Sequence, residues 1–515
     1  MEQRKNTLST FIVMGCTALS RLFGYVKVLL IAAFFGGSGA ADAINAAFNV
    51  PNSLRKIFAE GSLSSAFIPI LSETMSQDPQ GERSRRLVAN LLSFLMVILV
   101  PLTLASILFP RQFAAILPFE DLGKAALSAE LLRWMFSYIL FVSLSAVIAG
   151  VLNSHGSFVV PALSPLMFSV AIIGALVGLR SLGPYAMAVG VVVGGVVQLL
   201  FLMPAFFKRG YTLAPDLRLR NPDFLHTMKL WIPFVVTSSL YTVNQLIAYA
   251  FASGLEDGSA SALNYAITVT QLPVGIFSAS VVTVSFPAMS RQASRKDEAG
   301  LKESVLYGVE FLLTLMIPSA IALCALSKEV VSVAFQRGAF DAEATLRTSG
   351  VLIGYAAGLV SLTLFTFLQR FFYAVKDYRT PLLASAVVVT IDVVLSLILK
   401  ETPLRVAGLA YANTISFTVG LVIMAWRARK RLGRLEAVRI LASLGKSLLA
   451  SVPLTICAAA FRFLAGGLWR LGGGLRNIAV IGGLVCLCAA LTILVYLLLG
   501  VPYIRELIPG KRRRA

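Results

Sequence analysis

Long apolar segments recur along this chain, and each is long enough to cross a lipid bilayer. A helix of about 20 predominantly apolar residues spans the hydrocarbon core. We predict fourteen such spans, with approximate limits 9–35, 41–71, 86–110, 126–151, 158–180, 184–207, 229–253, 261–289, 304–327, 345–375, 381–399, 404–426, 440–465 and 477–500. The second has the weakest apolar character, and we expect a break at Pro51, where proline removes a backbone donor.

The composition supports an all-α polytopic membrane protein. Hydrophobic residues make up 57% of the 515 positions, and the mean hydropathy is +0.82. The five cysteines all lie in apolar stretches, which is typical of core residues and not of disulfides or a metal site. The first apolar run continues to about Phe35 with two cations inside it, so we expect an uncleaved membrane helix rather than a signal peptide.

The distribution of cations predicts the orientation. An even number of spans puts both termini on one side, and 28 of the 45 Lys and Arg residues fall on that side, with 11 on the other and 6 within helices. Because cytoplasmic loops carry the excess of cations, we expect both termini in the cytoplasm. This asymmetry explains most of the net charge of +20, so no nucleic-acid partner is needed. The basic tail 511–514 is predicted to bind anionic lipid at the membrane surface.

Proline motifs indicate an internal repeat. Pro69 and Pro287 both stand in a Pro-x-(Leu/Met)-Ser motif and are 218 residues apart. Pro161 and Pro381 each open an apolar segment and are 220 residues apart. Each offset corresponds to a shift of six predicted helices. An even number of helices per repeat keeps the orientation, so the sequence predicts two six-helix lobes in parallel pseudo-repeat.

The predicted organisation is therefore a first lobe over 1–207, a second over 208–430, and two further helices with the basic tail over 431–515. Two repeats around a midplane cavity are the architecture of a secondary transporter. No Walker loop, HExxH or GxSxG motif with supporting context occurs, so we do not expect an enzyme.

Ionisable side chains interrupt the first two spans. They are Arg21, Lys27, Asp42, Arg55, Lys56 and Glu60. An ionised group at bilayer depth costs roughly 2.5–3.5 kcal/mol, so we expect them to line a polar cavity. Arg suits bidentate capture of phosphate oxygens and Lys acts as a point charge, which predicts an anionic cargo such as phosphate or pyrophosphate. Asp42 and Glu60 can hold the cations in place when the cargo is absent.

Each cation also has a structural interpretation, as an alternative to a role in the cavity. Buried pairing can lock helices together, and long side chains can extend to the interface. Lys56 and Glu60 are four residues apart and can pair directly, so Lys56 fits this alternative. Arg21 lies ~16–18 Å into its helix at 1.5 Å per residue, where reaching the interface is difficult, and it fits a cavity role. Arg370 and Lys376 fit interfacial anchors at the end of the 345–375 span.

Asp392 is a lone acid inside the apolar 381–399 span, with no cation within a helical turn. Two interpretations stay open. An intramembrane acid is a candidate Na⁺ or H⁺ site, and it is equally a candidate partner for a residue of another helix. No other cofactor is expected.

The 20–69 region resembles the MurJ (MviN) family of lipid II flippases, of the MOP exporter superfamily. The matching motifs are Ser20-Arg21-x-x-Gly24-x-x-Lys27, Phe34-Phe-Gly36, Ala41-Asp42-Ala43, Phe48-x-x-Pro51-Asn52-x-x-Arg55-Lys56-x-Phe58-Ala59-Glu60-Gly61-Ser62 and Ala66-Phe67-Ile-Pro69. The fourteen-helix count fits the whole chain.

The resemblance implies movement of undecaprenyl-pyrophosphate-linked peptidoglycan precursor from the inner to the outer leaflet of the bacterial cytoplasmic membrane. It further implies alternating access by a monomer, driven by membrane potential or a Na⁺ or H⁺ gradient, with the last two helices forming a groove for the lipid tail. Carried over by position, Arg21, Lys27, Asp42, Arg55 and Glu60 match the family's functional polar residues. Lys27 stands where Arg is usual, so the charge is kept and bidentate capture is lost.

Two departures from the family pattern make the predicted cavity less cationic in its second half. Thr268 stands where a cavity Arg is usual, and Ala248 stands where some members have an acid that contributes, with the acid matched by Asp392, to a sodium site. The coupling ion is therefore open. The alternatives are another exporter of the superfamily, for polysaccharide-linked lipid or a drug cation, and a membrane scaffold without transport. A drug-cation exporter would need acids where this chain has mostly bases.

Overall fold

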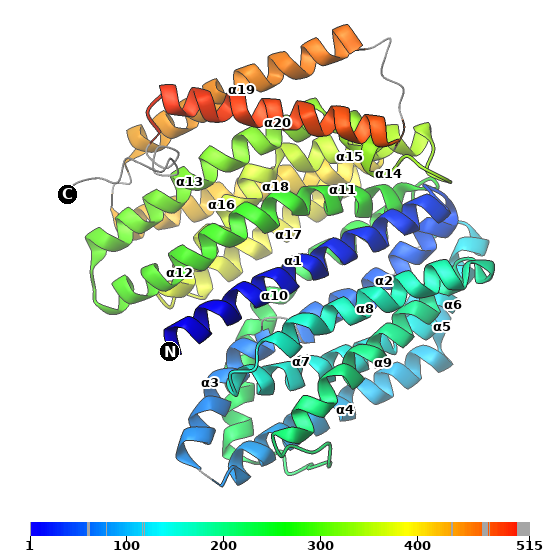
Figure 1. Cartoon of the computed structure of the whole chain (residues 1–515), viewed down its shortest axis with the longest axis vertical. Helices are drawn as coiled ribbons and strands as arrows, with labels where there is room; N and C mark the ends of the chain where they lie inside the picture. The colour runs from blue at the N-terminus through cyan, green and yellow to red at the C-terminus, as the bar shows by residue number, and fades with distance from the viewer. Residues whose placement is uncertain are drawn as a thin grey trace. The chain divides into compact units, whose positions relative to one another are not determined.

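The computed structural model describes residues 2–58, 62–78, 80–115, 117, 119–433, 436–465, 472 and 474–501, and within them every regular element is helical (Figure 1). The helices are α1 (Glu2–Phe35), α2 (Gly39–Phe58), α3 (Ser62–Gln77), α4 (Glu82–Leu108), α5 (Pro110–Ala114), α6 (Leu122–Met135), α7 (Tyr138–Ser154), α8 (Val159–Gly178), α9 (Tyr185–Lys208), α10 (Pro222–Ser253), α11 (Ser259–Pro273), α12 (Ala279–Ser294), α13 (Glu298–Ala325), α14 (Ser327–Phe335), α15 (Ala342–Ala357), α16 (Leu359–Ala374), α17 (Arg379–Leu399), α18 (Val406–Leu432), α19 (Ala437–Ala465) and α20 (Leu475–Leu498). A π-helical turn, Val274–Ser278, joins α11 to α12.

Eleven of the described helices or helix pairs are long and apolar enough to span a membrane, or twelve if the pair α15 and α16, bent by 45°, is one span. Two of the fourteen predicted spans are not among them. The 41–71 segment forms the short helices α2 and α3, and 229–253 lies in α10. The polytopic all-helical class is confirmed, and the count of fourteen stays a prediction. The expected break at Pro51 is wrong, since α2 continues through Pro51 to Phe58.

Contacts divide the chain into two compact units, Met1–Ser261 and Ala262–Ala515. In the first unit, α10 packs on α2 and α3, so the contact boundary falls after this helix rather than before it. The predicted lobes 1–207 and 208–430 and the 431–515 segment were defined by sequence repetition rather than by contacts, and they stay a prediction.

Helix packing inside the first unit recurs inside the second. The pairs α3–α7, α4–α7, α7–α9 and α8–α9 of the first unit correspond, in chain order, to α12–α16, α13–α16, α16–α18 and α17–α18 of the second. The prolines that suggested the repeat occupy matching helices, because Pro69 lies in α3 and Pro287 in α12. These four helix pairs are therefore common to the two units, while pairs such as α1–α8 and α2–α6 are found in the first unit alone among the contacts of the described residues.

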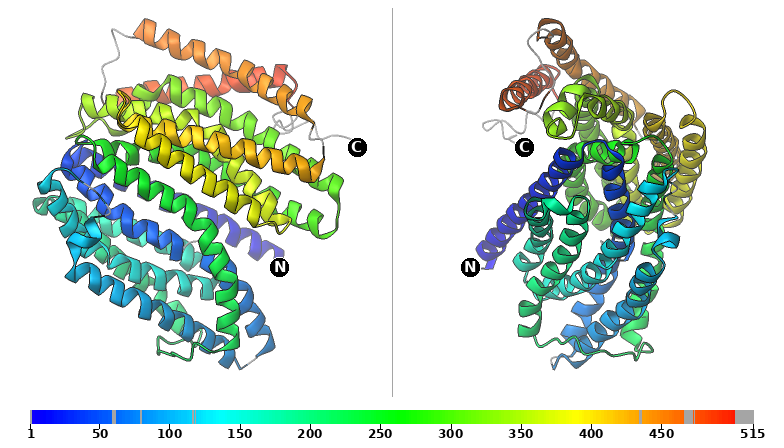
Figure 2. Two further views of the ribbon diagram at one scale, coloured as in Figure 1. Left: turned by 180° about the vertical axis from the view of Figure 1, so that it is seen from behind. Right: turned by 90° about the vertical axis from the view of Figure 1, so that its right-hand side faces the viewer.

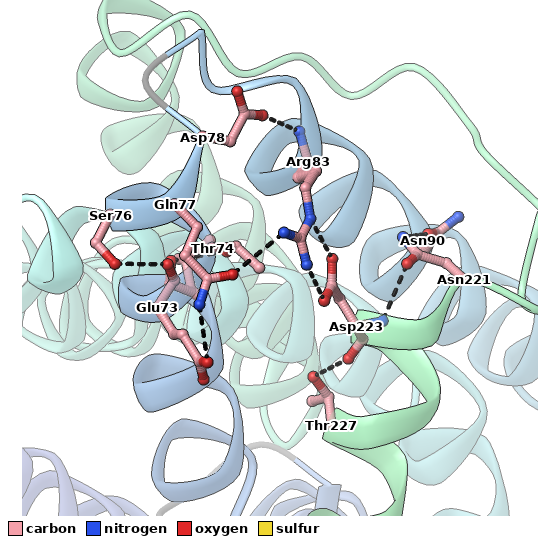
Figure 3. Close-up of polar contacts among 11 residues, drawn as sticks. Glu73, Thr74, Ser76, Gln77, Asp78, Arg83, Asn90, Asn221, Asp223 and Thr227 are labelled. Atoms are coloured by element: carbon pink, nitrogen blue, oxygen red, sulfur yellow. Dashed lines mark hydrogen bonds and ion pairs between the residues drawn. The ribbon is translucent and has the colours of Figure 1, made fainter.

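Polar contacts join α3, α4 and α10 in the first unit (Figure 3). The Arg83 guanidinium donates to both carboxylate oxygens of Asp223, at 2.8 and 3.2 Å, and also to Gln77 Oε1 at 3.2 Å. Beside this fork, Asn221 donates to Asn90 at 3.0 Å. Asp223 is in the first turn of α10, where a carboxylate also complements the helix dipole. These contacts fix the start of α10 to α4.

The last two helices, α19 and α20, lie side by side in the second unit (Figure 2), and ion pairs near the two ends of α19 bind it to α13 and α14. Near its start, Arg439 Nε lies 2.7 Å from Glu310 Oε1 of α13, whose side chain is buried. Near its end, Arg462 Nε lies 2.9 Å from Glu329 Oε1 of α14, which is also buried. Each pair joins a buried glutamate to a partly exposed arginine, so removing either arginine would leave a buried carboxylate without its cation.

Candidate functional site

Lys27 of α1 lies against an aromatic cluster built by α2, α7 and α8. Its Nζ is 4.5 Å from the ring centroid of Phe48 and 5.8 Å from that of Phe168. The Phe168 ring stacks on Tyr138 with centroids 4.6 Å apart. Aromatic faces attract a cation, and desolvation strengthens the attraction. The cluster therefore holds the ammonium in place without neutralising its charge.

Arg55 adds a second cation to the same region. It lies in the last turn of α2, half-buried, and its Nε donates to Asn52 Oδ1 at 3.1 Å. It lies on α2, which contacts α1, the helix that carries Lys27. Two cations on adjacent helices can together attract an anion. The structure thus places Lys27 and Arg55 on neighbouring helices of the first unit.

The other predicted residues of the first two spans differ in their surroundings. Arg21 lies on α1 and its side chain is exposed. Lys56 donates from Nζ to Gln245 Oε1 of α10 at 3.2 Å, a contact between helices that suits its structural interpretation. Glu60 lies outside the described residues, so its predicted pairing with Lys56 and its role in the cavity are not described.

Asp42 is buried and binds the start of α11 rather than a cation of the cavity. Its side chain is 1% exposed, and its two carboxylate oxygens accept from the backbone N–H of Gly258 at 2.7 Å and of Ser261 at 2.8 Å. One helical turn on, Asn45 donates to Ser261 Oγ at 3.1 Å. Backbone N–H groups at a helix start form a natural anion site. Asp42 fills that site with the protein's own carboxylate.

Two residues beside Asp42, Lys124 and Asp257, could not be identified as part of this site from the sequence alone. Lys124 Nζ lies 2.6 Å from Asp257 Oδ1, next to the Gly258 contact of Asp42. Gly39 packs so closely here that a Cβ would lie 2.8 Å from Lys124 Cδ and 3.0 Å from Asp257 Oδ2. Both charged residues lie at helix ends, where ionisable groups are common, so only the folded chain distinguishes this pair.

Asp392 of α17 is 4% exposed and accepts from side chains. Its Oδ2 accepts from Asn413 Nδ2 of α18 at 3.1 Å, and its Oδ1 from Ser396 Oγ at 3.4 Å. The contact with another helix matches one of the two interpretations of this acid. The same groups offer carboxylate, hydroxyl and amide oxygens, which are the donors of hard cations. Within the described residues no group of three His, Cys, Asp or Glu side chains gathers to hold a metal ion.

The two departures from the family pattern carry no charge. Thr268 is half-buried on α11 and donates to Asn264 O of its own helix at 2.8 Å. Ala248 is half-buried on α10. Neither residue can replace the charge that is usual at its position.

Known proteins similar to this chain support the family resemblance carried by its sequence motifs. A profile described as lipid II flippase MurJ matches residues 31–472. A probable lipid II flippase MurJ from Borreliella burgdorferi is 29% identical over 475 residues, which cover 92% of this chain and 93% of that protein. One from Bdellovibrio bacteriovorus is 30% identical over 495 residues, covering 93% and 92%.

Solved structures show the same fold. A lipid II flippase MurJ in an inward closed conformation aligns with a TM-score of 0.80 at 24% identity, covering 96% of this chain and 99% of that one. A multidrug resistance MATE family transporter of the MOP superfamily, in an inward-facing conformation, aligns with a TM-score of 0.65 at 13% identity, covering 83% and 99%. At these identities the likeness concerns the fold alone.

Proposed function

This chain belongs to the lipid II flippase MurJ family, and from that premise we propose how it moves its substrate. It is a multi-pass protein of the bacterial inner membrane that flips lipid II, and its task is transport rather than catalysis. The observation that carries this conclusion is the family match over residues 31–472, which spans both compact units.

The substrate's pyrophosphate binds to the cations of α1 and α2. Lys27 and Arg55 supply two neighbouring positive charges, and the aromatic cluster around Lys27 keeps its ammonium positioned before the substrate arrives. Arg55 can hold phosphate oxygens in bidentate fashion, while Lys27 contributes a point charge. Arg21 lies about one and two-thirds turns before Lys27 on α1, roughly 120° around the helix, and adds a further cation to this region. Glu60 completes the predicted group.

Transport proceeds by alternating access, with the two repeats rearranging around the cavity. The recurrence of the same helix pairs in both units supports this mechanism. Asp42 acts as a positioning residue, since its carboxylate holds the start of α11 instead of meeting a phosphate. Because Thr268 and Ala248 are uncharged, helices α1 and α2 carry more of the head-group binding than in a member with charged residues at those positions.

Asp392 couples transport to Na⁺, H⁺ or the membrane potential. Ser396 supplies a neighbouring hydroxyl oxygen and Asn413 faces Asp392 with its amide N–H₂, so the residues present fit a proton, and a hard cation would require the Asn413 amide to turn. The chain works as a monomer with both termini in the cytoplasm, in keeping with the cation asymmetry of its loops. Its tail 511–514, outside the described residues, contacts anionic lipid.

Replacement of a bacterium's resident lipid II flippase by this chain tests the activity. The wild-type chain should restore growth. Arg21→Ala should abolish flipping while leaving expression and membrane insertion intact, because loss of a midplane cation removes a pyrophosphate contact. The control is Arg111→Ala, which removes an exposed cation of α5 and should leave flipping unchanged. Normal flipping by Arg21→Ala would refute the cationic-cavity mechanism but not the family assignment.

A further inference from the structure

The second unit contains a cavity of about 500 Å³ where α12, α16 and α18 end and α13 begins. Three cations line it: Lys296 follows α12, Lys376 follows α16, and Arg431 lies in the last turn of α18. None of these residues belongs to the substrate site proposed above. The cavity therefore gathers positive charge from three separate helix ends.

Both lysines occupy a backbone conformation that favours glycine. Lys296 has φ of 56° and Lys376 has φ of 60°, in the left-handed region. Each closes the preceding helix with the same hydrogen bond, from Asp297 N to Gln292 O and from Asp377 N to Phe372 O, both 2.9 Å. Helices commonly end on glycine in this position, since a side chain there costs about 1 kcal/mol.

At the matching helix end of the first unit, a glycine occupies the left-handed position, where it causes less strain than a lysine. The helix α7 corresponds to α16, and Gly156 follows it with φ of 72°. Its closing bond runs from Ser157 N to Leu152 O at 2.9 Å. The fold therefore requires a left-handed residue here but does not require lysine. Strained residues that line a cavity are candidates for function.

The acids nearest the lysines already have backbone partners. Asp297 lines the cavity, but its Oδ1 accepts from Gly300 N at 2.9 Å and caps α13. Asp377 Oδ1 accepts from Arg379 N at 3.1 Å, at the start of α17. Glu298, in the first turn of α13, also lines the cavity. Asp297 and Asp377 are thus held by backbone N–H groups, and the three cations that line the cavity outnumber its two lining acids, Asp297 and Glu298.

A smaller basic cavity lies at the matching place in the first unit. Its volume is about 250 Å³, and Arg85, His155 and Arg209 are among its lining residues. They come from the start of α4, the end of α7 and the end of α9, which correspond to α13, α16 and α18. Tyr211 packs edge-on against His155 there, with centroids 5.4 Å apart. Two arginines thus line the cavity of the first unit beside Asp78, and the cavity of the second unit has about twice its volume.

We propose that the cavity lined by Lys296, Lys376 and Arg431 binds the phosphate of an anionic phospholipid head group. Arg431 can grip phosphate oxygens in bidentate fashion while the two ammonium groups neutralise the charge. Basic pockets between helix ends on the cytoplasmic side are suited to such head groups. The assignment of the cavity to the cytoplasmic leaflet rests on the orientation proposed above. The chemistry of the cavity does not depend on that orientation. The bound lipid would fix three helix ends of this unit at the membrane surface.

The test exploits the backbone of the two lysines. In the full-length chain, Lys296→Gly and Lys376→Gly are combined, which removes both charges and relieves both strained positions. The variant should therefore melt no lower than wild type. Arg405→Gly is the matched control, because Arg405 has φ of 44° and lies at the opposite end of α17, away from the cavity.

The probe is fluorescent phosphatidylglycerol, titrated against purified protein in zwitterionic micelles. At about 1 kcal/mol for each cation near an anionic surface, the double variant should bind at least tenfold more weakly. The control should stay within about twofold of wild type. Equal binding by wild type and the double variant would overturn the proposal, as would equal losses in the double variant and in Arg405→Gly.

Two further titrations identify the source of the phosphate. Phosphatidylcholine should bind wild type much more weakly than phosphatidylglycerol, because its head group carries no net charge. Inorganic phosphate should compete only at millimolar concentration if the lipid is the ligand. Competition by micromolar phosphate would instead assign the cavity to a soluble phosphate and overturn the lipid assignment. Flipping is measured separately and should persist in the double variant, so a failure of the transport mechanism leaves this binding result unchanged.

Discussion

Two buried aspartates, one in each compact unit, solve the problem of a carboxylate within apolar surroundings in different ways. Asp42 is 1% exposed and accepts from two backbone N–H groups at the start of α11. Asp392 is 4% exposed and accepts from the side chains of Asn413 and Ser396. The exposed fractions hardly differ, so the type of donor is the difference that matters.

Backbone donors are fixed by the helix that carries them, whereas side-chain donors can rotate away. Asp42 therefore stabilises one arrangement of its helix ends, and another ligand could reach it only if those ends moved. Asp392 can exchange a donor for an ion or a proton with rotamer changes alone. The backbone saturates Asp42 and makes it a structural element, whereas Asp392, held by neutral side chains, is a candidate coupling site.

The largest effect is expected from Asp42→Ala. It leaves the N–H groups of Gly258 and Ser261 buried without an acceptor, and each unpaired donor costs ~1–3 kcal/mol, so we expect about 3 kcal/mol of lost stability. Thermal unfolding of the purified protein measures this loss. In the same cluster, Asp257→Ala removes a largely exposed partner of Lys124 and should cost less than about 1 kcal/mol. Equal losses in the two variants would remove the distinction drawn for Asp42.

A smaller effect on stability and a specific effect on transport are expected from Asp392→Asn. The amide keeps the shape and can still pair with Asn413, so stability should change by no more than about 1 kcal/mol. Dependence of flipping on Na⁺, pH or membrane potential should be lost, because the group no longer carries a charge. Flipping assays in vesicles with imposed gradients measure it. An unchanged dependence would make Asp392 a structural residue like Asp42.

The smallest effect is expected at Asp78, which has backbone donors like Asp42 but lies in the loop before α4 (Figure 3). Hydrogen bonds from Arg83 N, at 2.7 Å, and then from other backbone groups lower the pKa of its carboxyl. A lowered pKa in the folded state gives stability that is present above the unfolded pKa, near 4, and is lost as the pH falls through the folded value.

Unfolding of wild type and Asp78→Asn between pH 7 and pH 3 measures this contribution. Wild type should be the more stable at pH 7, and the gap should close below about pH 4. A gap that does not change with pH would show that the loop gains nothing from the charge.

The spans were predictable because apolar length is a local property. The course of α2 was not, because the effect of Pro51 depends on its neighbours. Pro51 is buried, and the packing of α2 on α6 and α10 keeps the helix continuous past the missing donor. The 229–253 segment forms the helix that was expected, as part of α10.

The ionisable residues of the first two spans could be identified from the sequence but their contacts could not, and their role as a substrate site stays a prediction. The cost of burying a charge identified Lys27, Arg55 and Asp42 from sequence alone. Their partners could not be identified, because Asp42 and Gly258 are 216 residues apart and aromatic side chains such as Phe48 occur throughout the chain. The same argument applied to Glu310 and Glu329 would have flagged two more buried acids, which pair with α19.

The pairing of Glu310 with Arg439 has a consequence for how the chain is made. The acid precedes its cation by 129 residues, so it leaves the ribosome first. At 5–20 residues per second, the interval is roughly 6–26 s. During that time α13 must reside in the translocon or the bilayer with a carboxyl that its final partner cannot yet neutralise. Synthesis of α19 thus supplies the ion-pair partner of α13, a helix inserted much earlier. Ribosome stalling between the two helices would leave the second unit exposed to quality-control proteases.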